Sequence, residues 1–277
     1  MMAFKFVSNS IVTLSLTAFL TTAAVSKGAH AGDAFEDGYN AYQAGDFRAA
    51  LGLWRPLAAA GEARAQYNVG VMYADGRGVS RNRAEAIRWW QRAGEQGHVR
   101  ALHNLGLAYI GGVDVGQDYD AAVRFLKEAA SQGFPNSQYT LGKMYHYGLG
   151  VDKDFTMAAS YFEKVANKGF VKAAYNLGKA YRDGHGVAVD DVQSARWFRT
   201  AAEAGYGKAQ RHLARRLANG WGVEKNTEEA LKWAILASVK GIKNARKLED
   251  KLRMELTPEQ IATAEAAAKD FTPVRSN

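Results

Sequence analysis

Hydrophobic side chains recur at helical spacing along most of the chain. In the stretch KAAYNLGKAYRDG, Ala173, Leu177 and Tyr181 stand at positions i, i+4 and i+8 and form one apolar stripe. The stretch VQSARWFRTAAEAG carries a second stripe of this kind and ends at Gly205, a residue type that commonly terminates helices. The pattern therefore predicts a helix, a glycine-rich loop, a second helix and a short turn.

The same unit recurs at a constant step of 36 residues, the interval from Gly97 to Gly133. Paired apolar and small residues keep this step at Val69-Gly70, Leu105-Gly106, Leu141-Gly142, Leu177-Gly178 and Leu213-Ala214. The small residues of these pairs let the two helices of a unit approach closely. Because one hairpin cannot bury its apolar stripe alone, neighbouring units must stack on one another. The repeat therefore predicts an all-α solenoid.

One copy of the unit carries a specific motif. Residues 173–187 read A-x-Y-N-L-G-x-x-Y-x-x-G-x-G-V, and Trp197-Phe198 and an A-x-x-G ending at Gly205 follow. This motif resembles the Sel1-like repeat, a relative of the tetratricopeptide repeat. The resemblance covers residues 65–244 and implies five repeats in a right-handed α-solenoid of helix–loop–helix units. The second copy departs from the motif where Asp114 replaces the second glycine of the loop.

The segments on either side of the repeats are also helical in pattern. Residues 32–64 resemble a tetratricopeptide-type hairpin with a tighter turn at Gly45. Residues 245–277 are more polar, and Thr257 ahead of Pro258 is a helix-start signal. We expect the C-terminal segment to form capping helices that shield the last repeat from solvent.

The first residues have the composition of an export signal. Residues 1–31 combine Lys5, an apolar stretch over 11–25 and a small-residue cleavage site that ends at Ala31. The alternative, a retained membrane anchor, fits less well because the apolar stretch is short and rich in Ser and Thr. We expect cleavage after Ala31, a periplasmic location and no stable membrane insertion of the mature chain.

Composition and charge narrow the chemistry. The chain has 277 residues and no cysteine, which excludes thiol catalysis, thiolate metal sites and disulfides. Its net charge is +8, and removal of Lys5 and Lys27 with the signal leaves +6. An excess of positive charge is typical of proteins with acidic partners.

The loop DGHGV is the most site-like motif, since His185 lies between Gly184 and Gly186. A dinucleotide-type phosphate loop follows a strand, whereas a predicted helix precedes these glycines. The residues equivalent to His185 in the other copies are chemically unrelated: Arg77, Val113, Leu149 and Trp221. We interpret the glycines as structural and His185 as a variable loop residue. No H-E-x-x-H, G-x-S-x-G or G-K-[ST] motif occurs, so we predict no catalytic residue, cofactor or metal.

The outward positions of the first helices carry many basic and aromatic residues. In tetratricopeptide-like stacks these positions line the inner groove, which here becomes more positive toward the C-terminus. The candidate partner-binding residues are Arg64, Tyr67, Arg100, His103, Tyr139, Lys143, His146, Lys172, Tyr175, Lys179, Arg182, Lys208, Arg211 and Arg215. The alternative is an ordinary solvated helix face. We expect a protein segment or an acidic polymer as the ligand, with long extended or helical peptides fitting such a groove. We expect no nucleic acid, because an exported protein rarely meets it.

The family resemblance adds an expectation about function. Exported Sel1-like proteins commonly act as adaptors or regulators of envelope and signalling proteins. The arrangement of this chain most resembles rhizobial periplasmic regulators of exopolysaccharide production. It implies a negative regulator that binds the periplasmic domain of a membrane sensor histidine kinase in a two-component system. One alternative is an envelope scaffold for proteins that handle peptidoglycan or glycan. A β-lactamase-like hydrolase is disfavoured, because relatives described that way are rich in cysteine.

Overall fold

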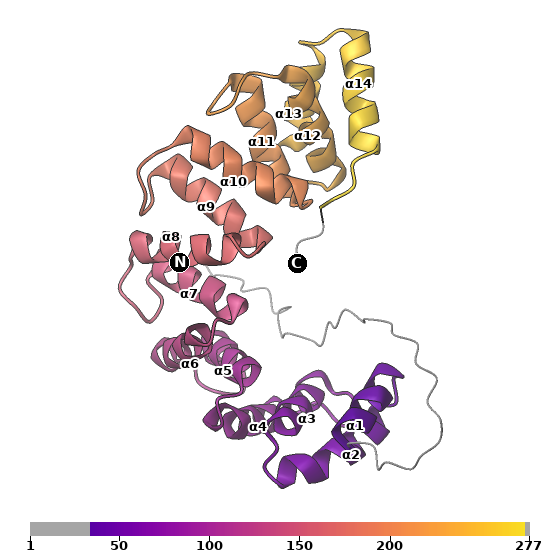
Figure 1. Ribbon diagram of the computed structural model, residues 1–277, viewed down its shortest axis with the longest axis vertical. Helices are drawn as coiled ribbons and strands as arrows, with labels where there is room; N and C mark the ends of the chain where they lie inside the picture. The colour runs from indigo at the N-terminus through magenta and orange to yellow at the C-terminus, as the bar shows by residue number, and fades with distance from the viewer. Residues whose placement is uncertain (1–33, 275–277) are drawn as a thin grey trace. The chain divides into compact units, whose positions relative to one another are not determined.

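The computed structural model describes residues 34–274, so the predicted signal peptide over 1–31 lies outside the described residues. The described part of the chain is entirely α-helical and contains fourteen helices (Figure 1), which confirms the predicted fold class. In chain order the helices are α1 (Ala34–Gln43), α2 (Phe47–Ala59), α3 (Ala63–Asp75), α4 (Arg83–Glu95), α5 (Val99–Gly111), α6 (Tyr119–Ser131), α7 (Pro135–Tyr147), α8 (Phe155–Ala166), α9 (Val171–Asp183), α10 (Asp191–Glu203), α11 (Gly207–Asn219), α12 (Thr227–Val239), α13 (Ala245–Arg253) and α14 (Pro258–Lys269). None of these helices has the length and apolar character needed to cross a membrane.

The chain divides into two compact units, and the boundary falls inside α7. Unit 1 extends to Ser137 and unit 2 begins at Gln138. In unit 1, α1 packs on α2, α3 on α4 and α5 on α6. In unit 2, α9 packs on α10 and α11 on α12. Each first helix of a predicted repeat thus packs on the second helix of the same repeat.

Glycine is required where the two helices of the first and fourth Sel1-like repeats meet. A Cβ atom at Gly70 would lie 2.5 Å from the indole nitrogen of Trp90. A Cβ at Gly178 would lie 2.9 Å from Cδ1 of Phe198. These distances are shorter than van der Waals contact, so any larger residue would push the helices apart. The predicted close approach at the glycine column is confirmed.

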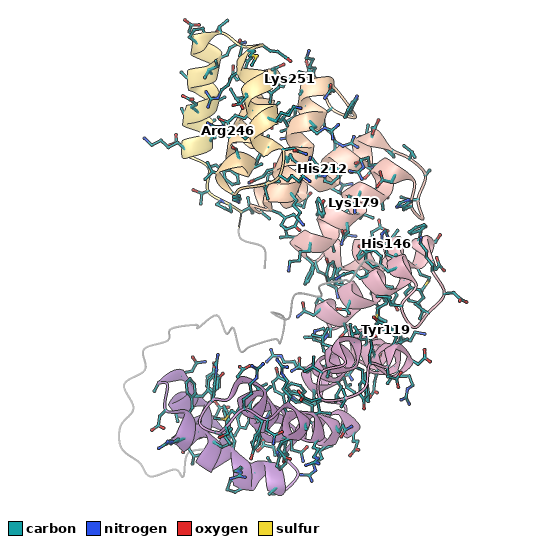
Figure 2. All side chains as sticks on the ribbon, turned by 180° about the vertical axis from the view of Figure 1, so that it is seen from behind. Tyr119, His146, Lys179, His212, Arg246 and Lys251 are labelled. Carbon is teal, nitrogen blue, oxygen red and sulfur yellow. The ribbon has the colours of Figure 1, made fainter. Side chains whose placement is uncertain are left out.

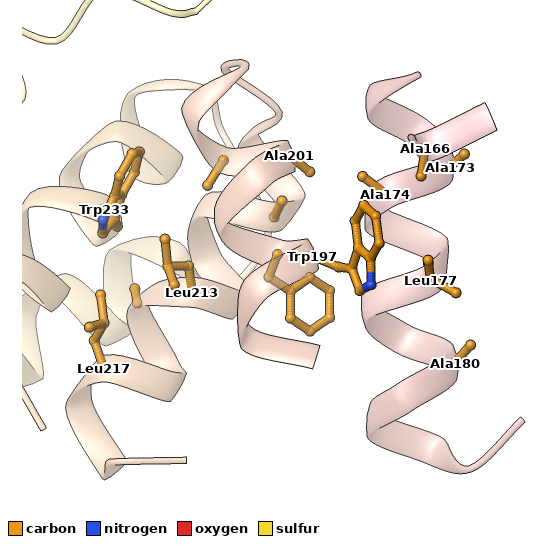
Figure 3. Packing of buried hydrophobic residues seen from close by; sticks show 14 of the residues in the cluster. Ala166, Ala173, Ala174, Leu177, Ala180, Trp197, Ala201, Leu213, Leu217 and Trp233 are labelled. Atoms are coloured by element: carbon orange, nitrogen blue, oxygen red, sulfur yellow. The ribbon is translucent and has the colours of Figure 1, made fainter. Parts of the chain in front are cut away.

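Each unit has its own hydrophobic core. In unit 1 the core includes Trp54 and Met72, both fully buried. In unit 2 it includes Leu177, Leu213 and Trp233, which Figure 3 shows between neighbouring helices. Burial of a side chain of this size stabilises the fold by about 1.5–3 kcal/mol relative to exposure. Because the chain lacks disulfides, this packing must hold the repeats together.

The glycines of the DGHGV loop have two distinct structural roles. Gly184 ends α9 in the left-handed conformation, with φ of 68°. Gly186 has φ of 79°, and a Cβ there would overlap the carbonyl oxygen of Phe155 at the start of α8. The structural interpretation of the glycines is confirmed. The second glycine has a further purpose, because it lets the loop rest against the preceding repeat.

The C-terminal helices begin and pack as the sequence predicts. Thr257 caps α14 through a capping box in which its hydroxyl accepts from the Gln260 backbone, and the Gln260 side chain accepts from the Thr257 backbone. Both α13 and α14 pack against α12. Beyond α14, Phe271 meets Trp233 edge to face at 5.3 Å. This segment covers the last repeat, whose Trp233 is only 2% exposed.

Candidate functional site

The predicted groove residues of unit 1 do not share one environment. Arg64 is exposed and Arg100 is half-buried, whereas Tyr67 and His103 are each only 2% exposed. The Tyr67 ring stacks on His98 with ring centroids 4.7 Å apart. Tyr67 and His103 were placed on the groove surface by sequence analysis, and the structure places both in the packing of unit 1 instead.

The physical reason is an aromatic contact between the first helix of a repeat and the last turn of the same repeat. His103 meets Phe134 with ring centroids 5.2 Å apart, and its Nδ1 lies 2.9 Å from the Ser137 hydroxyl. The equivalent pairs in unit 2 are Tyr139 with Phe170 at 4.9 Å and Tyr175 with Tyr206 at 5.1 Å. Each pair joins a first helix to the residue just before the next first helix. The sequence signal for these pairs is an aromatic column at the 36-residue step: His98, Phe134, Phe170 and Tyr206.

Unit 2 contains a cavity of about 260 Å³. Its lining comes from α7, α8, α9, the start of α11 and the loop after α9. Six of the predicted groove residues line it: Tyr139, Lys143, His146, Tyr175, Lys179 and Lys208. Figure 2 labels His146 on α7 and Lys179 on α9. The structure therefore brings together basic and aromatic residues that are far apart in sequence.

The inner side of the cavity combines apolar surface with uncharged polar groups. Ala158, Ala159 and Phe162 of α8 line it and are at most 4% exposed. Asn176 also lines it and donates a hydrogen bond of 3.2 Å to the Tyr139 hydroxyl. Burial raises the pKa of Tyr139 to about 12, so its hydroxyl stays neutral at physiological pH. The inner surface thus offers shape and hydroxyl groups rather than charge.

The charged groups that line the cavity are all positive or ionisable to positive. Burial lowers the pKa of Lys143, and the nearby charge of Lys172 lowers it further. Burial followed by the charge of Arg182 lowers the pKa of Lys179. Among the described residues that line the cavity there is no Asp or Glu. Two partly desolvated lysines without a carboxylate in the lining favour binding of an anionic group.

The histidines of this site add to the same electrostatic picture. Burial lowers the pKa of His146, and Lys179, His185 and Lys153 lower it further. The carboxylate of Asp183 lies close by, but it accepts hydrogen bonds of 2.6 and 2.7 Å from Arg182. This acidic group near His146 is therefore already held by an arginine.

His185 also lines the cavity, although sequence analysis did not assign it to the site. Its ring stacks on Phe155 with centroids 4.3 Å apart and 4° between the planes, and both residues line the cavity. The equivalent pair in unit 1 is Arg77 over Phe47, at 5.4 Å. Both pairs span 30 residues (47 to 77 and 155 to 185). In both cases, the variable loop residue packs on the first residue of the second helix in the preceding helical pair, which is α2 for Arg77 and α8 for His185.

The remaining predicted residues lie outside the cavity lining. Arg182 and Arg211 flank His212, with nitrogen–nitrogen distances of 3.4 and 3.2 Å. Lys172 is exposed in the first turn of α9, and Arg215 is exposed on α11, with its guanidinium 5.7 Å from the Trp221 ring centroid. These cations extend the positive charge along α9 and α11. No group of three or more His, Asp or Glu side chains suited to a metal occurs in the part of the chain that the structure describes.

Comparison with known proteins identifies the repeat. A family model described as Sel1 repeat matches five consecutive segments, at residues 63–98, 99–134, 135–170, 171–206 and 207–241. The chain belongs to the Sel1 repeat family. Sel1 repeats generally mediate protein–protein interaction, and the fold is typically a non-enzymatic scaffold. No curated protein matches this Sel1 repeat chain in sequence.

Solved structures of Sel1 repeat proteins have the same fold. A Sel1 repeat protein from Oxalobacter formigenes is 27% identical with a TM-score of 0.74, and the match covers 88% of this chain and 99% of that one. A protective antigen present in uropathogenic Escherichia coli strains, which displays an SLR fold, is 25% identical with a TM-score of 0.59. That match covers 86% of this chain and 60% of the antigen.

Proposed function

We propose that this Sel1 repeat protein acts by binding an acidic segment of a partner protein at the cavity of unit 2. The observation that carries the proposal is the lining itself. Lys143, Lys179 and Lys208 project from three successive first helices, and the described lining contains no carboxylate. A positive surface of this kind complements a negative one, which speeds encounter and selects against positively charged partners.

The low pKa of the two inner lysines supports an anionic ligand. Lys143 and Lys179 are half-buried, and burial is the main cause of their lowered pKa values. A carboxylate placed beside them would favour their charged form and replace the hydration that they have lost. Tyrosines around them offer large contact area with little side-chain entropy to lose, as is common in protein recognition.

The finer proposal concerns the partner and the compartment. We place the mature chain in the periplasm, where it restrains a membrane sensor histidine kinase by binding the kinase's periplasmic domain. The two-component system would control exopolysaccharide production. Support comes from the sequence arrangement: an export-type segment over residues 1–31, a short hairpin before the repeats, and no cysteine.

Charge reversal tests the binding surface. The variant combines Lys143→Glu, Lys179→Glu and Lys208→Glu, and the matched control combines Lys164→Glu, Lys168→Glu and Lys247→Glu. The control residues are exposed and do not line the cavity, but they change the net charge by the same amount. We expect purified kinase periplasmic domain to bind the control and not the cavity variant. Equal binding by both would place the partner surface elsewhere.

A deletion strain tests the role in signalling. We expect excess exopolysaccharide and altered transcription of genes that depend on the kinase, both restored by the control variant and not by the cavity variant. Unchanged exopolysaccharide would contradict the regulator. If partners captured from the periplasm were peptidoglycan-handling proteins instead, the chain would be an envelope scaffold.

A further inference from the structure

We propose that the cavity of unit 2 anchors one hydrophobic side chain of the partner, and that Asp or Glu residues flank this side chain in the partner's sequence. The proposal rests on the proposed function and names the kind of segment that the site selects. It is carried by the cavity's size, by the apolar part of its lining and by the placement of its cations.

The size of the cavity is sufficient for one large side chain. Pockets for small-molecule ligands usually measure about 300–1,000 Å³. The cavity here measures about 260 Å³, below that range. A space of this size suits one large side chain of a protein segment, with the rest of the segment lying outside.

The apolar part of the cavity lining suits an apolar group. Ala158, Ala159 and Phe162 form part of it, and the parallel rings of Phe155 and His185 form another part. A carboxylate pushed against Ala158, Ala159 and Phe162 would lose its hydration on an apolar surface, which is costly. An aromatic or long aliphatic side chain instead buries apolar surface and packs on the rings.

The cations are placed to meet carboxylates on both sides of the anchor. Lys143, Lys179 and Lys208 belong to α7, α9 and α11, so their charges are spread along three successive first helices. Lys208 is exposed, and the other two are half-buried. Long lysine stems pack along apolar surface while the ammonium groups stay near water. Three lysines on three helices can contact several carboxylates at once. They therefore match an extended segment with Asp or Glu before and after the anchor better than a ligand with one negative charge.

A free phosphate group is a poorer match for the same site. Backbone N–H groups at a helix N-terminus are the usual phosphate donors. The N-terminus of α8 borders the cavity at Phe155, but Asp154 already caps it by accepting a 2.9 Å hydrogen bond from the Met157 backbone. That carboxylate occupies the place where a phosphate would bind and repels a second anion.

Synthetic peptides of defined sequence test the proposal with the purified protein. Three fluorescein-labelled probes of equal length carry Phe between Asp and Glu residues, Ala between the same acids, or Phe between Asn and Gln residues. Fluorescence anisotropy measures their affinities. We expect the first probe to bind roughly tenfold more tightly than either of the others, because only it fills the pocket and meets the lysines.

Two variants separate the anchor from the charges. His185→Ala removes part of the pocket wall, so we expect it to weaken the acidic Phe probe and leave the acidic Ala probe unchanged. Lys208→Gln changes an exposed residue, so we expect it to weaken both acidic probes by the same factor. Circular dichroism and thermal unfolding of both variants check that the fold is retained. This pair of variants and probes forms a double-mutant cycle for the side chain in the pocket.

The outcomes distinguish this inference from the proposed function. Equal affinity for the acidic Phe and acidic Ala probes would overturn the anchor and leave binding of an acidic segment standing. Absence of binding by both acidic probes would overturn both. Displacement of the acidic Phe probe by a polyuronate at a much lower concentration than by unlabelled acidic Phe peptide would assign the site to an acidic glycan and overturn the proposal.

Discussion

A buried histidine in each unit shows how the two units differ. His103 of unit 1 is 2% exposed, and burial alone lowers its pKa to about 4. His212 of unit 2 is 9% exposed, yet its pKa is lowered further, to about 3. Burial is again the largest cause for His212, but four cations add to it: Arg211, Arg182, Arg215 and Lys179. The more exposed histidine is thus harder to protonate, because positive charge is concentrated around it.

The same difference appears at equivalent positions of the first helices. Val71 and Leu107 in unit 1 occupy the positions that Lys143, Lys179 and Arg215 occupy in unit 2. Val71 is 1% exposed and belongs to the core of unit 1. The repeat therefore fixes where each side chain lies but leaves its chemistry free. In unit 1 Val71 packs in the core and Leu107 is half-buried, whereas unit 2 has a cation at each of its three equivalent positions.

Exchanging residues between the two units at this position should change the free energy of unfolding more than any other substitution proposed below. Val71→Lys buries an unpaired ammonium group, so we expect it to lower the free energy of unfolding by about 4 kcal/mol. The reverse change, Lys179→Val in unit 2, should alter it by less than about 1 kcal/mol, because it removes one of several like charges. Urea unfolding followed by tryptophan fluorescence measures both. Similar losses for the two variants would show that the position has the same role in both units.

Replacing Gly186, the second glycine of the DGHGV loop, tests the contact between this loop and the preceding repeat. Gly186→Ala combines a left-handed backbone with overlap on Phe155, and we expect a loss of about 3–4 kcal/mol in the free energy of unfolding. Gly241→Ala is the matched control, since its φ is 65° and nothing lies within 4 Å of the added Cβ. The control should lose only about 1–2 kcal/mol. If both variants lost equally, the close approach to the preceding helix would be unimportant.

The loss of stability in acid should show that His103 is buried and neutral in the folded protein. Its pKa is about 4 in the folded protein and about 6.5 when unfolded, so the unfolded state binds more protons in between. The stabilising contribution is therefore complete above pH 6.5 and is lost as pH falls toward 4. The shift corresponds to roughly 3 kcal/mol. We expect His103→Gln to make the loss of stability between pH 6.5 and 4 shallower by about this amount.

Urea unfolding at a series of pH values measures this effect. The control is the region above pH 7, where His103 is neutral in both states and the slopes of the two proteins should agree. If the free energy of unfolding fell equally steeply between pH 6.5 and 4 in wild type and in His103→Gln, a buried, neutral His103 would be contradicted.

The fold followed from the sequence because its determinants are local and repeat. Each glycine in the column that includes Gly178 marks a contact within one helical pair, such as that of Gly178 with Phe198. The step of 36 residues makes these positions recognisable from the sequence alone. The family match at residues 63–241 agrees with that interpretation.

The site was less predictable because it depends on which neighbour a side chain meets. Equivalence between repeats placed Tyr67 and His103 beside Tyr139 and Tyr175, yet the latter pair lines the cavity of unit 2 and the former pair is buried. Sequence analysis left His185 out of the candidate site because the residues at its position in the other repeats are chemically unrelated. Its partner Phe155 lies in the preceding repeat, so only the folded chain shows the stack.

Salt should produce the smallest effect and sharpen the comparison further. Screening of charges over about 10 Å at 0.1 M ionic strength weakens repulsion among the cations around Lys179 and His212. We expect added sodium chloride to raise the free energy of unfolding by less than about 1 kcal/mol, because the groups are partly exposed. Lys179→Val should reduce this gain, and Leu107→Val, at the equivalent position of unit 1, should not. The two substitutions remove side-chain volume at matched positions, but only one of them removes charge. Equal salt dependence in both variants would mean that the charges near His212 do not repel one another enough to affect folding.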